Sequence, residues 1–184
     1  MNINDDWFFY ENNIETKDIR FVINKEIKNI EPLNKEIISL NGKKSNQYLL
    51  LESFKKNDTL INFKNYIVDN LKNYFKIQFN KKVDFTLLNA WTVLGNKDSF
   101  HTPHQHCTER NNHIACVIYL KTPKVNEDKP SQLYFFYYRN NKINYDFINP
   151  KENMICFFPA NMFHGTTPQG AGLRQTLNMD FSYE

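Results

Sequence analysis

Apolar residues recur at steps of three and four between residues 59 and 77, and this spacing predicts one amphipathic helix. The repeating positions are Leu60, Phe63, Ile67, Leu71 and Tyr74. Asp58 or Thr59 is the expected N-cap, because a short oxygen-bearing side chain can accept hydrogen bonds from the free N–H groups of the first turn. We expect the apolar stripe of this helix to pack on a sheet.

After Lys82 the pattern becomes alternating, which predicts strands. The longest runs from 83 to 95, with one face expected to carry Val83, Phe85, Leu87, Asn89, Trp91 and Val93. Further strand-like runs are 114–120, 132–138, 143–148, 154–158 and 174–181, and two shorter candidates precede the helix at 7–10 and 48–51. Strands separated by polar turns favour an antiparallel sandwich or barrel.

These elements predict an α+β, mainly β, fold: a jelly roll with a supporting helix. We expect one domain over residues 1–184, with an N-terminal support over 1–82 and a jelly-roll core over 83–184. The length suits one compact domain that buries its own core. Strand-helix alternation is absent from the pattern, so a doubly wound sheet is disfavoured.

Composition narrows the function. Only five of the 184 residues are glycine, and none of their spacings gives G-x-G-x-x-G or a P-loop, so the two standard phosphate-binding loops are excluded. The net charge is +3, and the basic pairs are scattered along the chain, which disfavours nucleic acid as a partner. Three cysteines without C-x-x-C favour a reducing compartment, and no apolar run approaches the roughly 18 residues of a membrane helix. We therefore expect a cytoplasmic protein with no membrane partner, and the Asn, Lys and Ile bias fits a bacterial or viral genome.

Histidine carries the candidate chemistry. Four of the five histidines lie between 101 and 113, and the fifth is His164. In an extended chain, residues i and i+2 share a face, so His104 and His106 can point at one ion while His101 has the opposite parity. With His164 they would form a three-ligand metal face with open positions for catalysis. A structural zinc site and a surface cluster without metal are the alternatives. The number and type of the ligands favour the open catalytic site, because closed zinc sites use four ligands, often Cys.

A second polar set lies ten residues after His164. Arg174, Thr176 and Asn178 alternate with apolar residues, so they share one face of the last strand. A guanidinium with a hydroxyl two residues further on can hold a carboxylate. An exposed polar face is the plainer explanation, but the position one strand after a metal-binding His favours an anchor for an acidic cosubstrate.

Over residues 83–182 the chain resembles the iron(II)- and 2-oxoglutarate-dependent oxygenases. The matching pieces are Ala90-Trp91, His104-Gln-His106, Ala115 to Leu120 with Tyr119, Phe157-Phe-Pro159 with His164, and Arg174-x-Thr176. The resemblance implies a double-stranded β-helix (jelly roll, cupin-like), with iron ligands at His104 and His164. It also implies that 2-oxoglutarate is the cosubstrate, with Arg174 and Thr176 on its distal carboxylate and Tyr119 as a further contact.

One position departs from the family pattern. Most members use His-x-Asp or His-x-Glu, and here His106 occupies the carboxylate position. The nearby acids Asp98 and Glu109 lie off the motif. Three possibilities stay open: a working site of His104, His106 and His164, a site completed by another residue, or a site that has lost catalysis. The intact Arg174-x-Thr176 favours the first.

The resemblance implies an iron(II)- and 2-oxoglutarate-dependent dioxygenase that hydroxylates its substrate and releases succinate and CO2. Our first candidate substrate is a peptide or protein side chain such as proline, followed by a small molecule. Two alternatives come from other classes: a three-His cupin-type dioxygenase that needs no 2-oxoglutarate, and a non-catalytic jelly-roll binding or structural module. His101 and His113 have no assigned role at this stage.

Overall fold

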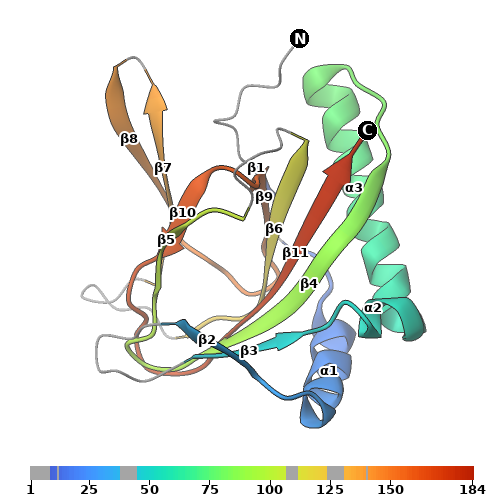
Figure 1. Ribbon diagram of the computed structural model, residues 1–184, viewed down its shortest axis with the longest axis vertical. Helices are drawn as coiled ribbons and strands as arrows, with labels where there is room; N and C mark the ends of the chain where they lie inside the picture. The colour runs from blue at the N-terminus through green and yellow to red at the C-terminus, as the bar shows by residue number, and fades with distance from the viewer. Residues whose placement is uncertain (1–8, 12, 38–44, 107–111, 124–130, 140) are drawn as a thin grey trace.

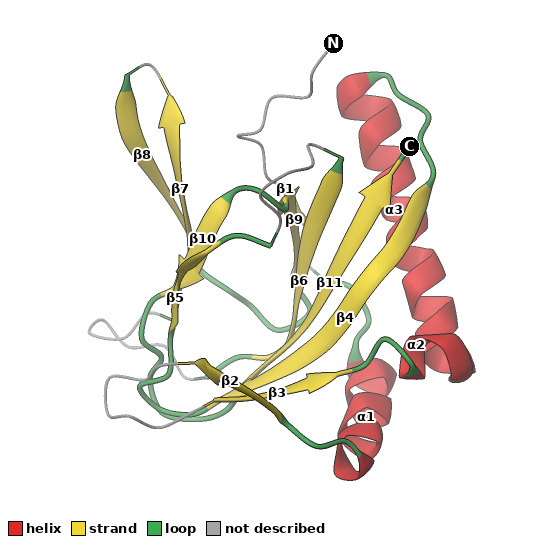
Figure 2. Ribbon diagram, in the orientation of Figure 1, coloured by secondary structure: helices red, strands yellow, loops and turns green. Residues whose placement is uncertain are grey.

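Two antiparallel sheets lie against each other in the computed structural model, and helices cover the outer face of the larger sheet (Figures 1 and 2). The structure describes residues 9–11, 13–37, 45–106, 112–123, 131–139 and 141–184. The helices are α1 (Lys17–Glu26), the short 3-10 helix η1 (Ile27–Asn29), α2 (Ser53–Lys56) and α3 (Asp58–Phe79). The strands are β1 (Phe9–Glu11), β2 (Leu33–Ile37), β3 (Ser45–Leu49), β4 (Phe85–Gly95), β5 (His101–His104), β6 (His113–Lys121), β7 (Leu133–Arg139), β8 (Lys142–Ile148), β9 (Ile155–Pro159), β10 (Phe163–Thr166) and β11 (Arg174–Tyr183).

The chain winds between the two sheets. The larger sheet has the order β1-β9-β6-β11-β4-β3-β2, and the smaller has the order β5-β10-β7-β8. Along the chain, β4, β6, β9 and β11 therefore belong to one sheet, and β5, β7, β8 and β10 to the other. This is the winding of a double-stranded β-helix, and it confirms the predicted mainly β jelly roll with a supporting helix.

Two apolar cores lie on opposite faces of the larger sheet. On β6, Ile114, Cys116, Ile118 and Leu120 join the core beneath the helices, whereas Ala115, Val117 and Tyr119 join the core between the sheets. Both sets are buried because β6 is covered on both faces, which explains why the run 114–120 is almost continuously apolar. The core between the sheets backs the functional site described below.

Helix α3 extends slightly beyond the predicted 59–77. Its buried residues are Leu60, Phe63, Ile67, Leu71 and Phe75, so the apolar stripe packs on the sheet as expected. The predicted cap at Asp58 or Thr59 is wrong. Asn57 caps the helix, and its side-chain oxygen accepts hydrogen bonds from the N–H groups of Thr59 and Leu60 at 3.1 and 3.4 Å. The cap is Asn57 because its backbone is extended while Asp58 is already helical.

The single face predicted for residues 83–95 is also wrong. Asp180 on β11 pairs with Asn89, and the next residue, Phe181, pairs with Leu87, so Leu88 is an extra, bulged residue on β4. A bulge shifts the alternation by one position. Phe85 and Leu87 therefore pack under the helices, whereas Asn89 and Trp91 face the cavity between the sheets.

Several shorter elements differ from expectation. Helix α1 and strands β2, β5 and β10 were not predicted. The expected strand 7–10 is observed only as β1, since residues 7 and 8 lie outside the described part of the chain, and the expected strand 48–51 is shifted to Ser45–Leu49. The strands among these segments are only three to five residues long, so a period is hard to recognise in them.

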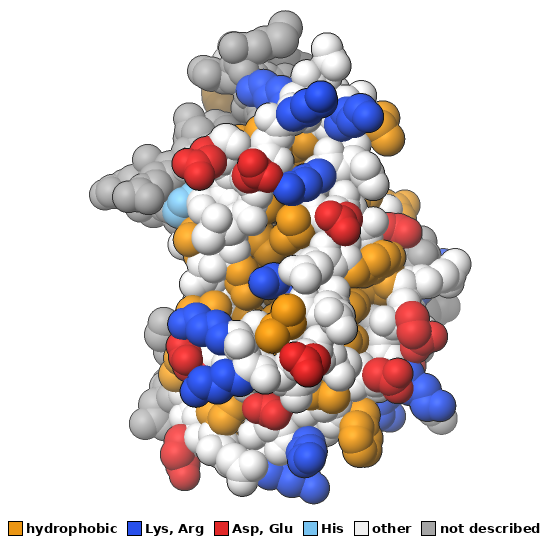
Figure 3. Space-filling view, turned by 90° about the vertical axis from the view of Figure 1, so that its right-hand side faces the viewer, with side chains coloured by type: hydrophobic (Ala, Val, Ile, Leu, Met, Phe, Trp, Pro, Cys, Tyr) orange, Lys and Arg blue, Asp and Glu red, His pale blue; other side chains and the backbone are white. Residues whose placement is uncertain are grey.

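The helix-bearing face has an ordinary charge distribution. Lys and Arg side chains are interspersed there with Asp and Glu around patches of apolar surface (Figure 3). Among the described residues, no helix is both long enough and apolar enough to cross a membrane.

Candidate metal and cosubstrate site

A cavity of about 390 Å³ lies between the two sheets. Strands β4, β6 and β11 of the larger sheet line one side, and β5 and β10 of the smaller sheet line the other. The lining residues discussed below are Trp91, His101, His104, His106, Tyr119, His164, Arg174, Thr176, Asn178 and Asp180. The cavity therefore contains every site residue predicted from the sequence.

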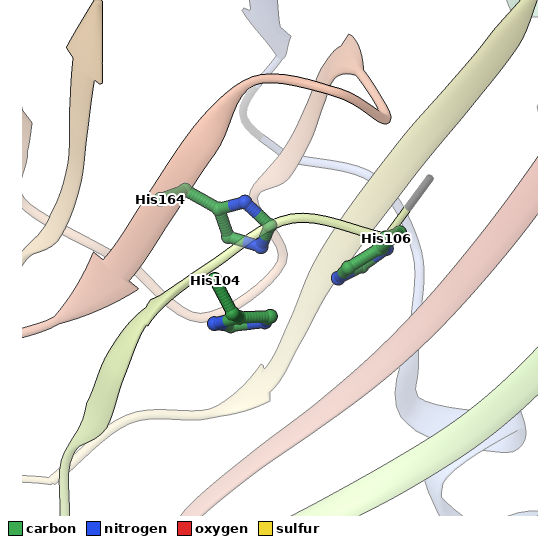
Figure 4. Close-up of side chains that lie close together, drawn as sticks. All are labelled: His104, His106 and His164. Carbon is green, nitrogen blue, oxygen red and sulfur yellow. The ribbon is translucent and has the colours of Figure 1, made fainter. Parts of the chain in front are cut away.

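Three histidines that line the cavity converge on one another (Figure 4). One ring nitrogen from each of His104, His106 and His164 lies within 4.8 Å of the others. His104 ends β5 and pairs directly with His164 on β10, so the sheet register sets their distance. His106 follows two residues later, and its ring centroid lies 5.4 Å from that of His104 and 4.8 Å from that of His164.

The three rings are held in one tautomer. Nδ1 of His104 lies 2.9 Å from the Thr102 carbonyl oxygen, and Nδ1 of His164 lies 3.0 Å from that of Met162. Nδ1 of His106 lies 2.7 Å from a carboxylate oxygen of Asp180. Because these oxygens only accept, each Nδ1 carries the proton and donates it. Each Nε2 is left with a free lone pair, which is the form that binds a metal ion.

Electrostatics favours the neutral form of His164 and of His104. Burial, followed by the neighbouring rings of His106 and His104, lowers the pKa of His164 well below its usual value. Burial also lowers the pKa of His104, and the hydrogen bond to Thr102 opposes this only in part. Neutral imidazoles are the species that coordinate divalent metals, so the site is prepared for a cation at neutral pH.

The cavity is also lined by buried donors without an acceptor. Arg174 is 2% exposed and Tyr119 is 1% exposed. Neither Nη1 of Arg174 nor the hydroxyl of Tyr119 has a hydrogen-bond partner among the described residues. Thr176 accepts a hydrogen bond from the Asn178 amide at 3.2 Å, which leaves its own hydroxyl proton available. A buried guanidinium without a carboxylate is costly, so this end fits an anionic group.

His101 has no role assigned from the sequence, and in the structure it lies beside the histidine cluster but is not part of it. His101 lines the same cavity, because the pairing of β10 with β5 shifts register between His164 and Thr166 and so disturbs simple alternation. Its Nε2 is buried and has no hydrogen-bond partner among the described residues. His113 and Asp98 do not line the cavity, and Cys107 and Glu109 lie outside the described residues.

Asp180 is the residue that sequence reasoning missed. It lies on the cavity face of β11 and makes the hydrogen bond to His106. The signal was present, since Arg174, Thr176 and Asn178 already define that face and Asp180 is the next residue of the same parity.

Comparison with solved structures shows the fold. A viral collagen prolyl hydroxylase from Paramecium Bursaria Chlorella virus-1, in complex with 2OG, is 14% identical with a TM-score of 0.64, and the match covers 96% of each chain. A Trichoplax adhaerens prolyl hydroxylase with a hypoxia inducible factor peptide is 16% identical with a TM-score of 0.67, covering 97% of this chain and 84% of that one. The epimerase SnoN with Fe3+, alpha ketoglutarate and nogalamycin RO is 9% identical with a TM-score of 0.71, and the match covers 98% of this chain and 80% of that one.

Comparison of the sequence itself gives the family. No curated protein sequence matches the chain. The family model described as "Putative 2OG-Fe(II) oxygenase" matches residues 89–180, which is half of the chain and contains the histidine cluster and Arg174. The chain therefore belongs to this family of 2OG-Fe(II) oxygenases.

Proposed function

We propose that this protein is an iron(II)- and 2-oxoglutarate-dependent hydroxylase whose metal ligands are His104, His106 and His164. The observation that carries the proposal is the common tautomer: all three Nδ1 atoms donate to fixed oxygens, which leaves three Nε2 lone pairs for one ion. A closed structural zinc site would need a fourth ligand. No other His, Cys, Asp or Glu among the described residues joins this group.

Arg174, Thr176 and Tyr119 would hold the distal carboxylate of 2-oxoglutarate. Arg174 and Tyr119 each present a buried donor without a partner, and Thr176 has a hydroxyl proton to give. Burial lowers the pKa of Arg174 and raises that of Tyr119, yet the guanidinium stays charged and the phenol stays protonated near neutral pH. Both are therefore donors toward an anion.

Iron and 2-oxoglutarate, when bound, would supply the oxidation by O2: one oxygen atom enters succinate as the keto acid loses CO2, and the other becomes the hydroxyl group of the substrate. The chain's own residues bind and orient these groups and enclose the site. Phe158 and Phe135 pack behind His164, with ring centroids 4.5 and 6.3 Å from it, and keep water away from that side.

The substrate we propose is a peptide or protein side chain, with a prolyl residue as the first candidate. A cavity of about 390 Å³ is at the small end of ligand sites, and the cosubstrate must share it. The remaining room suits one inserted side chain better than a whole large metabolite. Two of the structurally similar proteins are prolyl hydroxylases, which supports this choice, whereas SnoN, with nogalamycin RO bound, favours a small molecule.

Anaerobic titration of the purified protein with iron(II) and 2-oxoglutarate tests the site. We expect the visible charge-transfer band of a chelated keto acid, lost in His164→Ala and weakened in Arg174→Ala. The matched control is Arg20→Ala, which removes an arginine from α1 on the opposite side of the larger sheet. If the band persists in both site variants, the assignment is wrong.

Aerobic assays separate the remaining functions. Succinate formed in the presence of prolyl peptides supports the hydroxylase. Oxygen uptake with a substrate but without any keto acid would instead support a cupin-type dioxygenase, and the absence of bound iron and of turnover would support a binding module.

A further inference from the structure

The three histidine ligands contain no negative charge, and a carboxylate lies directly behind one of them. We propose that Asp180 is a positioning residue of the metal site: it orients His106 toward the ion and supplies the charge that the His-x-His motif lacks. This inference rests on the proposed function.

The contact is specific to one of the three ligands. His104 and His164 donate to neutral carbonyl oxygens, whereas His106 donates to the Asp180 carboxylate at 2.7 Å. The side chains of His106 and Asp180 are only 10% and 16% exposed, so the pair is largely shielded from water. A charged acceptor makes a stronger hydrogen bond than a carbonyl oxygen and increases the electron density of the ring.

The position of Asp180 explains the departure from the family pattern. In a His-x-Asp motif the second residue contributes its carboxylate to the ion directly. Here the imidazole of His106 occupies that position, and the carboxylate lies on the far side of the ring, on β11. Among the described residues, His106 is the one whose side chain is hydrogen-bonded to the Asp180 carboxylate. The acid is therefore present, but it acts through the histidine.

Metal affinity is the direct readout. We expect apoprotein carrying Asp180→Ala to bind Co(II) about 10 to 100 times more weakly than wild type, the usual cost of losing a carboxylate behind a metal-bound histidine. Asp180→Asn keeps an acceptor but loses the charge, so its affinity should be intermediate. The absorption spectrum of bound Co(II) should also shift. Asp146→Asn is the matched control, because Asp146 is likewise hydrogen-bonded, to Tyr137 at 2.7 Å, on a strand away from the ion.

A structural role gives a different result. If Asp180 only stabilised β11, its variants would lower the unfolding midpoint of the apoprotein and leave Co(II) affinity and spectrum unchanged, which would overturn the inference. Nitrogen NMR of the His106 ring adds a test without metal: Nδ1 should remain protonated in wild type and exchange between nitrogens in Asp180→Ala. If wild type binds no Co(II), the proposed function itself fails.

A separate observation concerns the outer face of the smaller sheet. The outward positions of β7, β8 and β10 carry seven large apolar side chains: Tyr134, Phe136, Tyr138, Ile143, Tyr145, Phe147 and Phe163. Five of these are between 41% and 71% exposed. They form one surface, because Tyr134 pairs with Phe147 across the strands and the Phe136 ring lies 5.1 Å from that of Phe163. We call these seven residues the aromatic face.

We infer that the aromatic face is the interface of a homodimer. At roughly 200 Å² for an aromatic side chain, its exposed parts amount to about 600 Å², at the upper end of what soluble monomers leave uncovered. Two copies would bury about 1,200 Å² in total, the lower end of specific interfaces. The outward positions of the three strands carry no charged side chain. A two-fold dimer brings the same surface of both copies together, so no like charges would face each other there.

Sedimentation velocity over a range of protein concentrations tests the dimer. We expect wild type to dimerise in the micromolar range, and Tyr145→Lys or Phe147→Lys to be monomeric, because each would bury an unpaired charge in an apolar interface. Phe21→Lys is the matched control: Phe21 is 72% exposed on α1, away from the hairpin of β7 and β8 (Figure 1). Co(II) binding by each variant reports folding. A monomeric wild type, or a dimer that both lysine variants leave intact, would overturn the inference, as would a peptide substrate that occupies this face on a monomer.

Discussion

His164 connects the protonation of the metal site to the stability of the apoprotein. Its pKa is lowered in the folded chain by burial and by His106 and His104, whereas in the unfolded chain it returns to about 6.5. The unfolded state therefore takes up a proton at higher pH than the folded state does. The contribution of His164 to stability is complete above about pH 6.5 and is lost as the pH falls below that value.

We expect the urea midpoint of the metal-free protein to fall between about pH 7.5 and about pH 5.5. His164→Asn should show a shallower fall, since it removes one of the groups that protonates on unfolding. Identical pH profiles for wild type and variant would contradict this explanation.

Gly165 lies on β10, between β5 and β7. An added Cβ would contact the Tyr134 hydroxyl and would lie 2.8 Å from the His101 carbonyl oxygen. The tyrosine can move, but the backbone oxygen can move only if β5 shifts relative to β10. Since that pairing sets the distance from His104 to His164, the site would be disturbed.

Gly165→Ala should therefore destabilise the protein by about 1–3 kcal/mol, the usual cost of overpacking. Its Co(II) affinity should fall by about tenfold or more, as when a ligand loses its orientation. The double variant Gly165→Ala with Tyr134→Ala removes only the movable contact, so it should regain some stability but not the metal affinity. Full recovery of both would show that the backbone contact is harmless.

At the scale of elements, α3 supports the sheet without touching the cavity. Asn57→Ala removes the side-chain acceptor for the N–H groups of Thr59 and Leu60 and should cost about 0.5–2 kcal/mol of unfolding free energy. Asp58→Ala is the matched control and should cost less, since Asp58 lies inside the helix. Both should bind Co(II) as wild type does. An effect of Asp58→Ala equal to that of Asn57→Ala would restore the cap predicted from the sequence.

The long elements were predictable because each has a clear apolar period. The stripe of α3 and the double-sided burial of β6 are visible in the sequence alone. Strands β5 and β10 were not visible, because their four residues each carry histidine, proline or glycine instead of an apolar alternation. These two strands hold two of the three proposed ligands, so the site could be inferred from residue type while its scaffold could not.

Pairing between strands explains the other errors. Whether a residue faces the cavity or the helices depends on the register with its neighbour, and a bulge changes that register without any local sign. The bulge at Leu88 explains why residues 83–95 do not share one face. The register shift between His164 and Thr166 explains why His101 lines the cavity although its parity differs from that of His104. Asp180 is the reverse case. The regular alternation of β11 places it on the same face as Arg174, so its position was predictable although it was not predicted.

At the scale of the whole molecule, the two cores should affect function differently. Leu71 is buried in the core under the helices, and Phe135 is buried in the core behind His164. We expect Leu71→Ala to cost about 2–5 kcal/mol and Phe135→Ala about 3–5 kcal/mol in urea unfolding. Only Phe135→Ala should also weaken Co(II) binding, because its cavity opens beside a ligand. Equal losses of metal affinity would show that the larger sheet transmits packing defects to the site.

The bulged residue Leu88 divides β4 into two parts that face different regions of the molecule. Before Leu88, the odd-numbered side chains of β4 pack beneath the helices. After Leu88, the odd-numbered side chains of Asn89 and Trp91 line the cavity. Because the bulge reverses the alternation, one strand contributes side chains both to the core beneath the helices and to the cavity, on opposite faces of the sheet. Substitutions that suit a new substrate can then accumulate at Asn89 and Trp91 with little effect on the seam that Phe85 and Leu87 form with α3. A single bulged residue thus allows the cavity to change in evolution separately from the core that supports it.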